Sequence, residues 1–351
     1  MGTAYPYPRK ETIMKKLFTL LLVCALTVCM MASCGGSDKL FDYNYDEYVA
    51  LGNYKGVEVS ASAIETEVQA QIDSVLASNA KDVDTGAAAV EGNKVVYSVT
   101  ATVNGADAAE LAKTDASLTL GTGKTGLDDL DAAFVGMSAG DKKEVTLTVP
   151  ADHTGNAEVD GKEAVLSVTV SAVTENVKPE ELTDEMVATA TNSTYTTVAD
   201  YMVYLRSAIK QNLVWNTILA NTTYSNYPKK EAEMYYDNYL ASYQNSAAQY
   251  GMTLESMASM YGMTLDAFQN SLAQQAIAQV NQDMAMFAVA AKENLVPGDE
   301  KLASVKQEMM AYYGYPDEAT MMADIGEDAL EQSATYEMVM EFVEANAVEV
   351  E

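Results

Sequence analysis

The hydrophobic pattern changes its period near residue 178, and this change limits the fold more than any other feature of the sequence. Before it, runs at 95–103, 144–149 and 164–173 are rich in valine and threonine and alternate apolar with polar residues. A period of two indicates strands with one buried face. After Lys178-Pro179, apolar residues recur at helical spacing almost to the end of the chain. The pattern predicts an α+β fold, in which a small antiparallel sheet is followed by an all-α part.

Two helices are predicted beside the strands. The segment 127–137 has helical spacing and is expected to cover one face of the sheet. Ahead of the sheet, the segment 63–80 carries an apolar residue at every fourth position, which is typical of a helix with one buried face.

Helix start signals divide the second half of the chain. Thr197 is predicted to cap a helix over 198–220, a second helix is expected over 228–250, and a final one over 327–346. Thr264 is predicted to open a long helix. That helix carries one apolar stripe, formed by Phe268, Leu272, Ala276, Val280, Phe287 and Ala291.

A short motif separates these helices from one another. Tyr-Gly-Met-Thr-Leu followed by an acid occurs at Tyr250 and again at Tyr261, and a weaker echo begins at Tyr313. Glycine accepts the left-handed conformation that ends a helix, and threonine caps the start of the next one. Each copy is therefore predicted to end one helix and to begin another.

The first 33 residues are predicted to be a secretory signal. Lys15 and Lys16 precede an unbroken apolar run that ends in small residues before Cys34. The sequence Met31-Ala32-Ser33-Cys34 resembles the bacterial lipobox, so Cys34 is expected to be lipidated and to become the mature N-terminus, with Met14 as the true start. An uncleaved membrane anchor is the alternative. Both place the rest of the chain outside the cytoplasm.

Residue counts argue against several kinds of site. Without the first 33 residues, the chain keeps one cysteine, Cys34, and one histidine, His153, too few ligands for a zinc site. No metal or other cofactor is therefore expected. The remaining 17 basic and 50 acidic residues give a net charge of −33. Repulsion from phosphate backbones argues against binding of nucleic acid or of the ribosome.

The chain resembles trigger factor in a series of segments that occur in the order of that family: LGNYKGVEV at 51–59, LTLGTGK at 118–124, LDAAFVGMSAGDKKEVTLTVP at 130–150 and KPEELTDEMV at 178–187, before long helices. That family joins an FKBP-type peptidyl-prolyl isomerase domain to a helical chaperone domain with two arms. The likeness is greatest to its lipoprotein relatives in Gram-positive bacteria. The ribosome-docking signature of the family does not occur in this sequence, and a signal and lipobox stand in its place.

The resemblance implies a division of the chain into domains. The expected parts are a signal peptide at 1–33, a lipid-anchored tether and entry segment at 34–56, a linking helix of the helical domain at 57–85, an FKBP-like domain at 86–177, and a helical domain similar to the trigger factor C-terminal domain at 178–351. The implied location is the outer face of the membrane of a bacterium, most simply a Gram-positive one.

An FKBP-type isomerase holds a proline in a groove lined with aromatic rings and lets its peptide bond rotate. The resemblance places four of these aromatic positions at Val99, Leu130, His153 and Leu166. None of them is phenylalanine, tyrosine or tryptophan, so the isomerase is expected to be weak or inactive. His153 is more simply explained as a surface histidine than as a catalytic base, because no nucleophile motif accompanies it.

Methionine and tyrosine gather around the repeated motif. Both suit surfaces that accept many apolar partners, because methionine is flexible and tyrosine joins an apolar ring to a hydroxyl. The predicted client-binding residues are Met252, Met257, Met260, Met263, Tyr239 and Tyr243. Packing of helix against helix is the alternative for each of them.

These features together predict a membrane-tethered, extracytoplasmic chaperone that works without ATP and binds apolar stretches of unfolded, newly translocated polypeptides. Two alternatives stay open at this point. The first is an active peptidyl-prolyl isomerase whose helical arms present the substrate, and the second is a structural or adhesive surface lipoprotein that reuses the fold.

Overall fold

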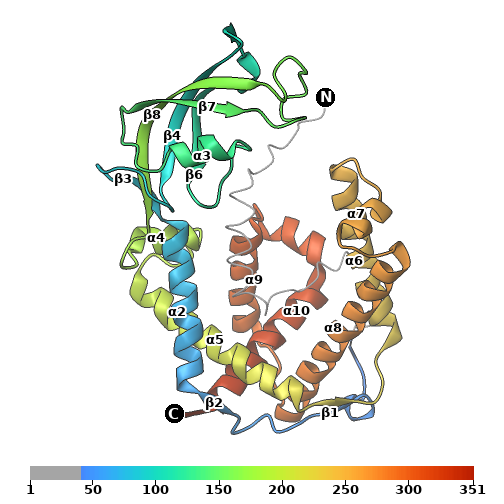
Figure 1. Cartoon of the computed structure of the whole chain (residues 1–351). Helices are drawn as coiled ribbons and strands as arrows, with labels where there is room; N and C mark the ends of the chain where they lie inside the picture. Colours follow the sequence, from blue (N-terminus) through green and yellow to red (C-terminus); the bar gives the residue numbers. More distant parts are fainter. Residues whose placement is uncertain (1–40) are drawn as a thin grey trace. The chain divides into compact units, whose positions relative to one another are not determined.

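The computed structural model describes residues 41–351, and this part of the chain divides into two compact units (Figure 1). The sheet unit runs from Ile72 to Met186, and the helical unit combines the chain up to Gln71 with Val187–Glu351. The predicted signal peptide, the start at Met14 and the lipidation site at Cys34 lie outside the described residues. Among residues 41–351, no helix combines the length and the apolar composition needed to span a bilayer.

The sheet unit is antiparallel throughout its described strands. Strand β8 pairs along one edge with β4 and along the other with β7 and β3, while β4 also pairs with β5 and β6. Register shifts on both sides of Tyr97 interrupt the pairing of β4, and such irregularities bend a strand. The strands are β3 (Lys81–Asp84), β4 (Lys94–Val103), β5 (Ala106–Asp107), β6 (Lys113–Thr119), β7 (Lys142–Thr148) and β8 (Glu163–Val177).

The three predicted strand runs are confirmed as β4, β7 and β8, and the predicted covering helix is confirmed in a shorter form. Helix α3 spans Asp128–Ala133 instead of 127–137, because Gly136 adopts a φ of 85° and turns the chain away from the helix. Phe134, completely buried, follows α3 directly and fills the core between the helix and the sheet. A short 3-10 turn, η2 (Ala109–Leu111), lies between β5 and β6.

The helical unit is built mainly from long helices. Helix α2 begins in this unit and ends in the sheet unit, and α10 packs against α5, α8 and α9. The helices are α2 (Ala61–Ser78), α4 (Asp184–Ala190), α5 (Val198–Ala220), α6 (Lys229–Gln249), α7 (Leu254–Met260), α8 (Leu265–Glu293), α9 (Asp299–Tyr313) and α10 (Glu318–Ala345). We call α6, α7 and α8 together the arm, because α6 packs along α8 and α7 contacts both (Figure 1).

Short strands join the segment before α2 to the rest of the helical unit. Strand β1 (Val49–Ala50), which follows the 3-10 turn η1 (Tyr45–Glu47), pairs antiparallel with β9 (Thr223–Tyr224). Strand β2 (Glu58–Ser60) pairs in parallel with β10 (Val348–Val350) near the end of the chain. The helical unit is therefore discontinuous in sequence, with the whole sheet unit inserted into it.

Most helix predictions are confirmed, with corrections in detail. The Thr197 hydroxyl caps α5 by accepting the N–H of Asp200, as expected. Gly326, with φ 78° and ψ 170°, kinks α10, and the predicted final helix over 327–346 corresponds to the part after this kink. The predicted stripe of α8 is buried from Phe268 to Val280 but ends early, since Phe287 is only half-buried and Ala291 is exposed. Strand β3, exposed throughout, was not predicted.

Candidate functional site

The repeated motif ends helices in the predicted way. Gly251 and Gly262 have φ values of 66° and 71°, in the left-handed region that glycine occupies without strain. The N–H of Met252 donates to the carbonyl of Ala247 at 2.9 Å, and the matching bond after the second glycine joins Met263 to Ala258 at 3.0 Å. These bonds are the helix-ending pattern expected after a C-terminal glycine.

The threonines of the same motif begin the next helices. Thr253 accepts the N–H of Ser256 through its hydroxyl at 3.1 Å, and Thr264 accepts that of Ala267 at 3.2 Å. The weaker copy of the motif behaves alike, because Gly314 has a φ of 72° and Asp317 caps α10 by accepting the N–H of Thr320. The prediction that each copy ends one helix and begins another is confirmed. The two full copies enclose the short helix α7 at the end of the arm.

The sharp turns around α7 leave a group of apolar side chains in water. Tyr250 is 71% exposed, Met260 73%, Tyr261 60% and Met263 42%. We call these four residues the tip patch. Two of them stand at the turns themselves, because each tyrosine is the C-cap residue directly before a left-handed glycine.

The six predicted client-binding residues divide into two groups. Met260 and Met263 belong to the tip patch, whereas Met257 is only 8% exposed and Met252 is half-buried. Tyr243 stands edge-on to the ring of Phe268 at a centroid distance of 5.1 Å, and Tyr239 stacks on Tyr235 at 6.2 Å. Tyr239 and Tyr243 also pack against the cluster of Ala258, Phe268 and Leu272, and so help to hold α6, α7 and α8 together, whereas Met257 is buried in α7.

Sequence reasoning left two exposed rings out of the predicted set. Tyr250 was absent from it although the residue opens the first copy of the motif, and Tyr261 opens the second copy. Tyr261 also stacks flat on Phe268, with 5.9 Å between the ring centroids and an angle of 5° between the planes. The signal for both was the motif itself, since a residue at the end of a helix lies outside its buried stripe.

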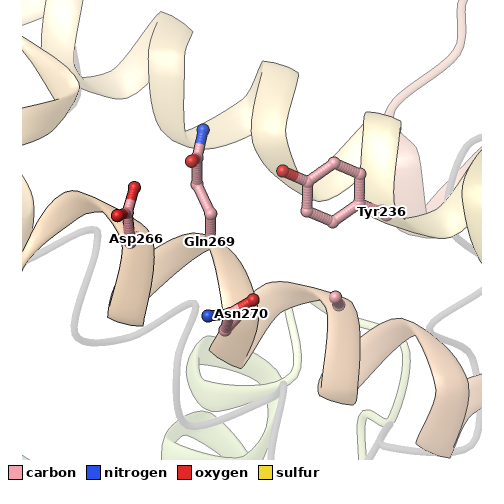
Figure 2. Close-up of a pocket in the computed structure, with 5 residues that line it drawn as sticks. Tyr236, Asp266, Gln269 and Asn270 are labelled. Atoms are coloured by element: carbon pink, nitrogen blue, oxygen red, sulfur yellow. The ribbon is translucent and has the colours of Figure 1, made fainter.

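An open, polar pocket lies between α6 and the first turns of α8. Figure 2 shows Tyr236 on α6 facing the same space as Gln269 and Asn270 on α8. The pocket has a volume of about 320 Å³, and Asp266 and Ala273 complete its lining. Its hydroxyl, amide and carboxylate groups offer donors and acceptors to a polar partner such as a peptide backbone.

Deeper in the arm, a buried carboxylate joins α6 to α8. Asp283, 7% exposed, accepts hydrogen bonds from the hydroxyl of Tyr235 at 2.7 Å and from Nε2 of Gln279 at 2.9 Å. Burial raises the pKa of Asp283 to about 7, against the smaller opposing effect of these two hydrogen bonds. This carboxyl group therefore changes its protonation state near neutral pH.

The four predicted groove residues of the sheet unit do not form an open surface. Val99, Leu130 and Leu166 belong to one apolar cluster and are exposed by at most 3%. His153 is exposed, and its ring lies so close to Gly126 that a Cβ atom there would approach its Cε1 to 2.9 Å. The structure thus packs three of these side chains together in the core and leaves the fourth on the surface.

An aromatic pair in the same core was missed. The rings of Tyr97 and Phe134 lie 4.6 Å apart, and Tyr97 is 5% exposed. Burial and, to a lesser extent, the charge of Asp131 raise the pKa of Tyr97. The signal was available in part, because Tyr97 occupies an inward position of the alternating strand.

The family model and the related proteins that resemble this chain all point to the same family. Residues 205–345 match the family described as the C-terminus of bacterial trigger factor protein. Trigger factor of Clostridium beijerinckii is 25% identical over 317 residues, which cover 85% of this chain and 73% of that protein. Trigger factor of Desulforudis audaxviator is 36% identical over 140 residues, which cover 39% of this chain and 31% of that one.

A solved structure described as "Promiscuous Substrate Recognition in Folding and Assembly Activities of the Trigger Factor Chaperone" is 16% identical and aligns with a TM-score of 0.32, covering 86% of this chain and 72% of that one. That score is too low for a comparison of the two folds.

Proposed function

Since the chain is a trigger factor-like protein, we propose that it is an ATP-independent chaperone that binds apolar stretches of unfolded polypeptides through the tip of its arm. The proposal includes a location, the outer face of a bacterial membrane, to which the chain is tethered by a lipid on Cys34. Its clients are then chains that emerge from the membrane after translocation.

The tip patch is the observation that carries the proposal. Two methionines and two tyrosines stand exposed within 250–263. The chain as a whole has a net charge of −30, so charged residues were available to cover this surface and do not do so. Grouped apolar side chains in water mark a contact surface. Methionine adapts its shape and tyrosine contacts both apolar and polar groups, so this surface suits clients of varied sequence.

Weak binding explains how clients leave without ATP. The tip patch is small and surrounded by water, so each contact with a client is brief and the complex dissociates quickly. Repeated binding keeps an apolar stretch covered until the client buries it within its own fold.

The proposed tether rests on the sequence alone. Two lysines, an apolar run and Met31-Ala32-Ser33-Cys34 follow one another in the order of a lipoprotein signal. The surplus of acidic residues supports a partner that is neither nucleic acid nor the ribosome.

The sheet unit is proposed to contribute little isomerase activity. Val99, Leu130 and Leu166 fill the core and have almost no surface to offer a proline ring. Catalysis of this rotation needs an apolar surface that holds the twisted amide, and no acid or base substitutes for it.

The test uses protein that lacks residues 1–34, mixed with a chemically unfolded client. Light scattering follows aggregation of the client, and isomerisation of a proline peptide is timed in parallel. Suppressed aggregation with little gain in the isomerisation rate supports the proposal. A clear rate gain without suppression shows that the protein is an isomerase first.

A further inference from the structure

Residues 41–46, within the predicted tether and entry segment, are packed into the root of the arm, where α6 begins and α8 ends. Phe41 is only 2% exposed, and its ring stacks on Phe287 of α8 with 5.2 Å between the centroids. The ring of Tyr45 also stacks on Phe287, at 6.4 Å. The buried residues that surround Phe41 are Ala232 and Tyr235 of α6 and Ala276, Val280 and Met284 of α8.

A buried carboxylate makes this packing specific. Glu231, in the first turn of α6, is 1% exposed. Its Oε1 accepts the backbone N–H of Phe41 at 3.3 Å, and its Oε2 accepts the hydroxyl of Tyr43 at 2.8 Å. Burying a carboxylate is costly unless hydrogen bonds replace its water, and both replacements come from the same short segment.

The segment also fixes its own shape. The hydroxyl of Tyr45 donates to the carbonyl of Phe41 at 2.8 Å, which folds the segment back on itself. Lys292 near the end of α8 forms an ion pair with Asp46 at 3.0 Å, on the outside of the contact. Residues 41–46 therefore fit the root of the arm by apolar packing, by hydrogen bonds and by charge.

We propose that the root of the arm is a binding site for an aromatic segment, filled in this chain by Phe41–Tyr45, and that this docking connects the tether to the arm. Phe41 is seven positions after Cys34, a stretch of chain that spans at most about 25 Å. When the segment leaves, Glu231 loses both hydrogen-bond donors inside an apolar cluster, so α6 and α8 separate at their root to let water in. The docking rests on these contacts and is independent of the proposed function.

The test is hydrogen exchange in the full chain. Phe41→Ala removes the stacked ring, and Glu231→Gln keeps the size of the side chain but places an amide where two donors converge. Both variants are expected to raise exchange at the start of α6 and at the end of α8 by about tenfold or more. Tyr43→Phe, which removes only one hydroxyl, is expected to raise it less. Asp46→Asn is the matched control, because it removes an exposed ion pair of the same segment and is expected to change exchange by less than about twofold.

The sheet unit provides an internal standard, since amides of β4 and β8 are expected to keep their protection in every variant. Should Phe41→Ala unfold the whole helical unit, the milder Tyr43→Phe still decides the matter. Exchange at the root that is unchanged in Phe41→Ala or Tyr43→Phe overturns the proposal. Wild-type protein that fails to suppress aggregation overturns the proposed function instead and leaves the docking intact.

Discussion

The hydroxyl of Tyr235 on α6 lies 2.7 Å from Oδ2 of Asp283 on α8, in a part of the arm where both side chains are buried. The burial of this carboxylate makes the stability of the arm depend on pH. Burial raises the pKa of Asp283 from 3.8 to about 7, so the folded arm binds a proton more tightly than the unfolded chain does. The stabilisation by that proton is complete below pH 3.8 and is lost as the pH rises through about 7.

Asp283→Asn is therefore expected to stabilise the arm at pH 8 relative to the wild type and to change little at pH 5. Between these values the wild type should lose up to roughly 1.4 kcal/mol of unfolding free energy per pH unit through this residue, and the variant should not. Urea denaturation at pH 5 and pH 8 measures the difference. All other titrating groups are shared, so equal pH dependence in the two proteins would show that Asp283 is not the source.

Changing Tyr250, Met260, Tyr261 and Met263 together to serine is expected to reduce suppression of client aggregation severalfold. Three of these side chains are at least 60% exposed, and the fourth is 42% exposed, so the thermal unfolding temperature should change little. Light scattering and thermal unfolding on the same samples test both points. The matched control is Val203→Ser with Val296→Ser, because these valines are 75% and 74% exposed outside the arm. An equal loss in the control would argue that exposed apolar side chains act anywhere on the protein.

Met257→Ala is expected to loosen the tip without removing a contact surface. The side chain is 8% exposed, and deletion of a buried methionine costs roughly 2 kcal/mol or more. Hydrogen exchange in α7 should therefore become faster, while Met260→Ala, three residues further along, should leave it unchanged. Similar exchange in the two variants would contradict the burial of Met257.

Gly262→Ala is expected to destabilise the junction of α7 and α8 by about 1–2 kcal/mol. A Cβ atom at Gly262 meets no other atom within 4 Å, so the cost comes from the φ of 71° alone. Gly298→Ala is the control, because its Cβ atom is equally free while its φ is −87°. Urea denaturation compares the two variants, and equal stability of Gly262→Ala and Gly298→Ala would rule out conformational strain at Gly262.

The local features were predictable from the sequence because neighbouring residues determine them. Gly262 and Thr264 end and begin helices through bonds that reach no further than five residues, so the motif alone sufficed. Burial within the arm was not predictable in the same way. Met257 and Met260 are of the same type and share one short helix, yet one is 8% and the other 73% exposed, a difference that the residue types alone do not decide.

Contacts between residues far apart in the sequence were not predictable from it. The N–H of Phe41 meets Glu231 across 190 residues, and no periodicity marks either partner. Strand β3 has the sequence Lys-Asp-Val-Asp and is exposed, so its extended form follows from pairing with the end of β8 and not from its own residues. The alternation of β4 gave the inward face of the sheet, whereas the enclosure of Val99 and Leu166 depends on how the strand bends at its irregularities.

The insertion of the sheet unit into the helical unit sets an order of events for a chain that emerges residue by residue. The sheet unit is one continuous stretch, so it is able to fold as soon as its last strand, β8, has appeared. The helical unit has to wait, because β2 finds its partner only when β10 arrives some 290 residues later. Until that moment β2 has no strand to pair with, although β1 finds its partner β9 and the segment around Phe41 finds α6 and α8 earlier. The chain that is proposed to protect unfolded proteins therefore passes through a long unfolded period of its own.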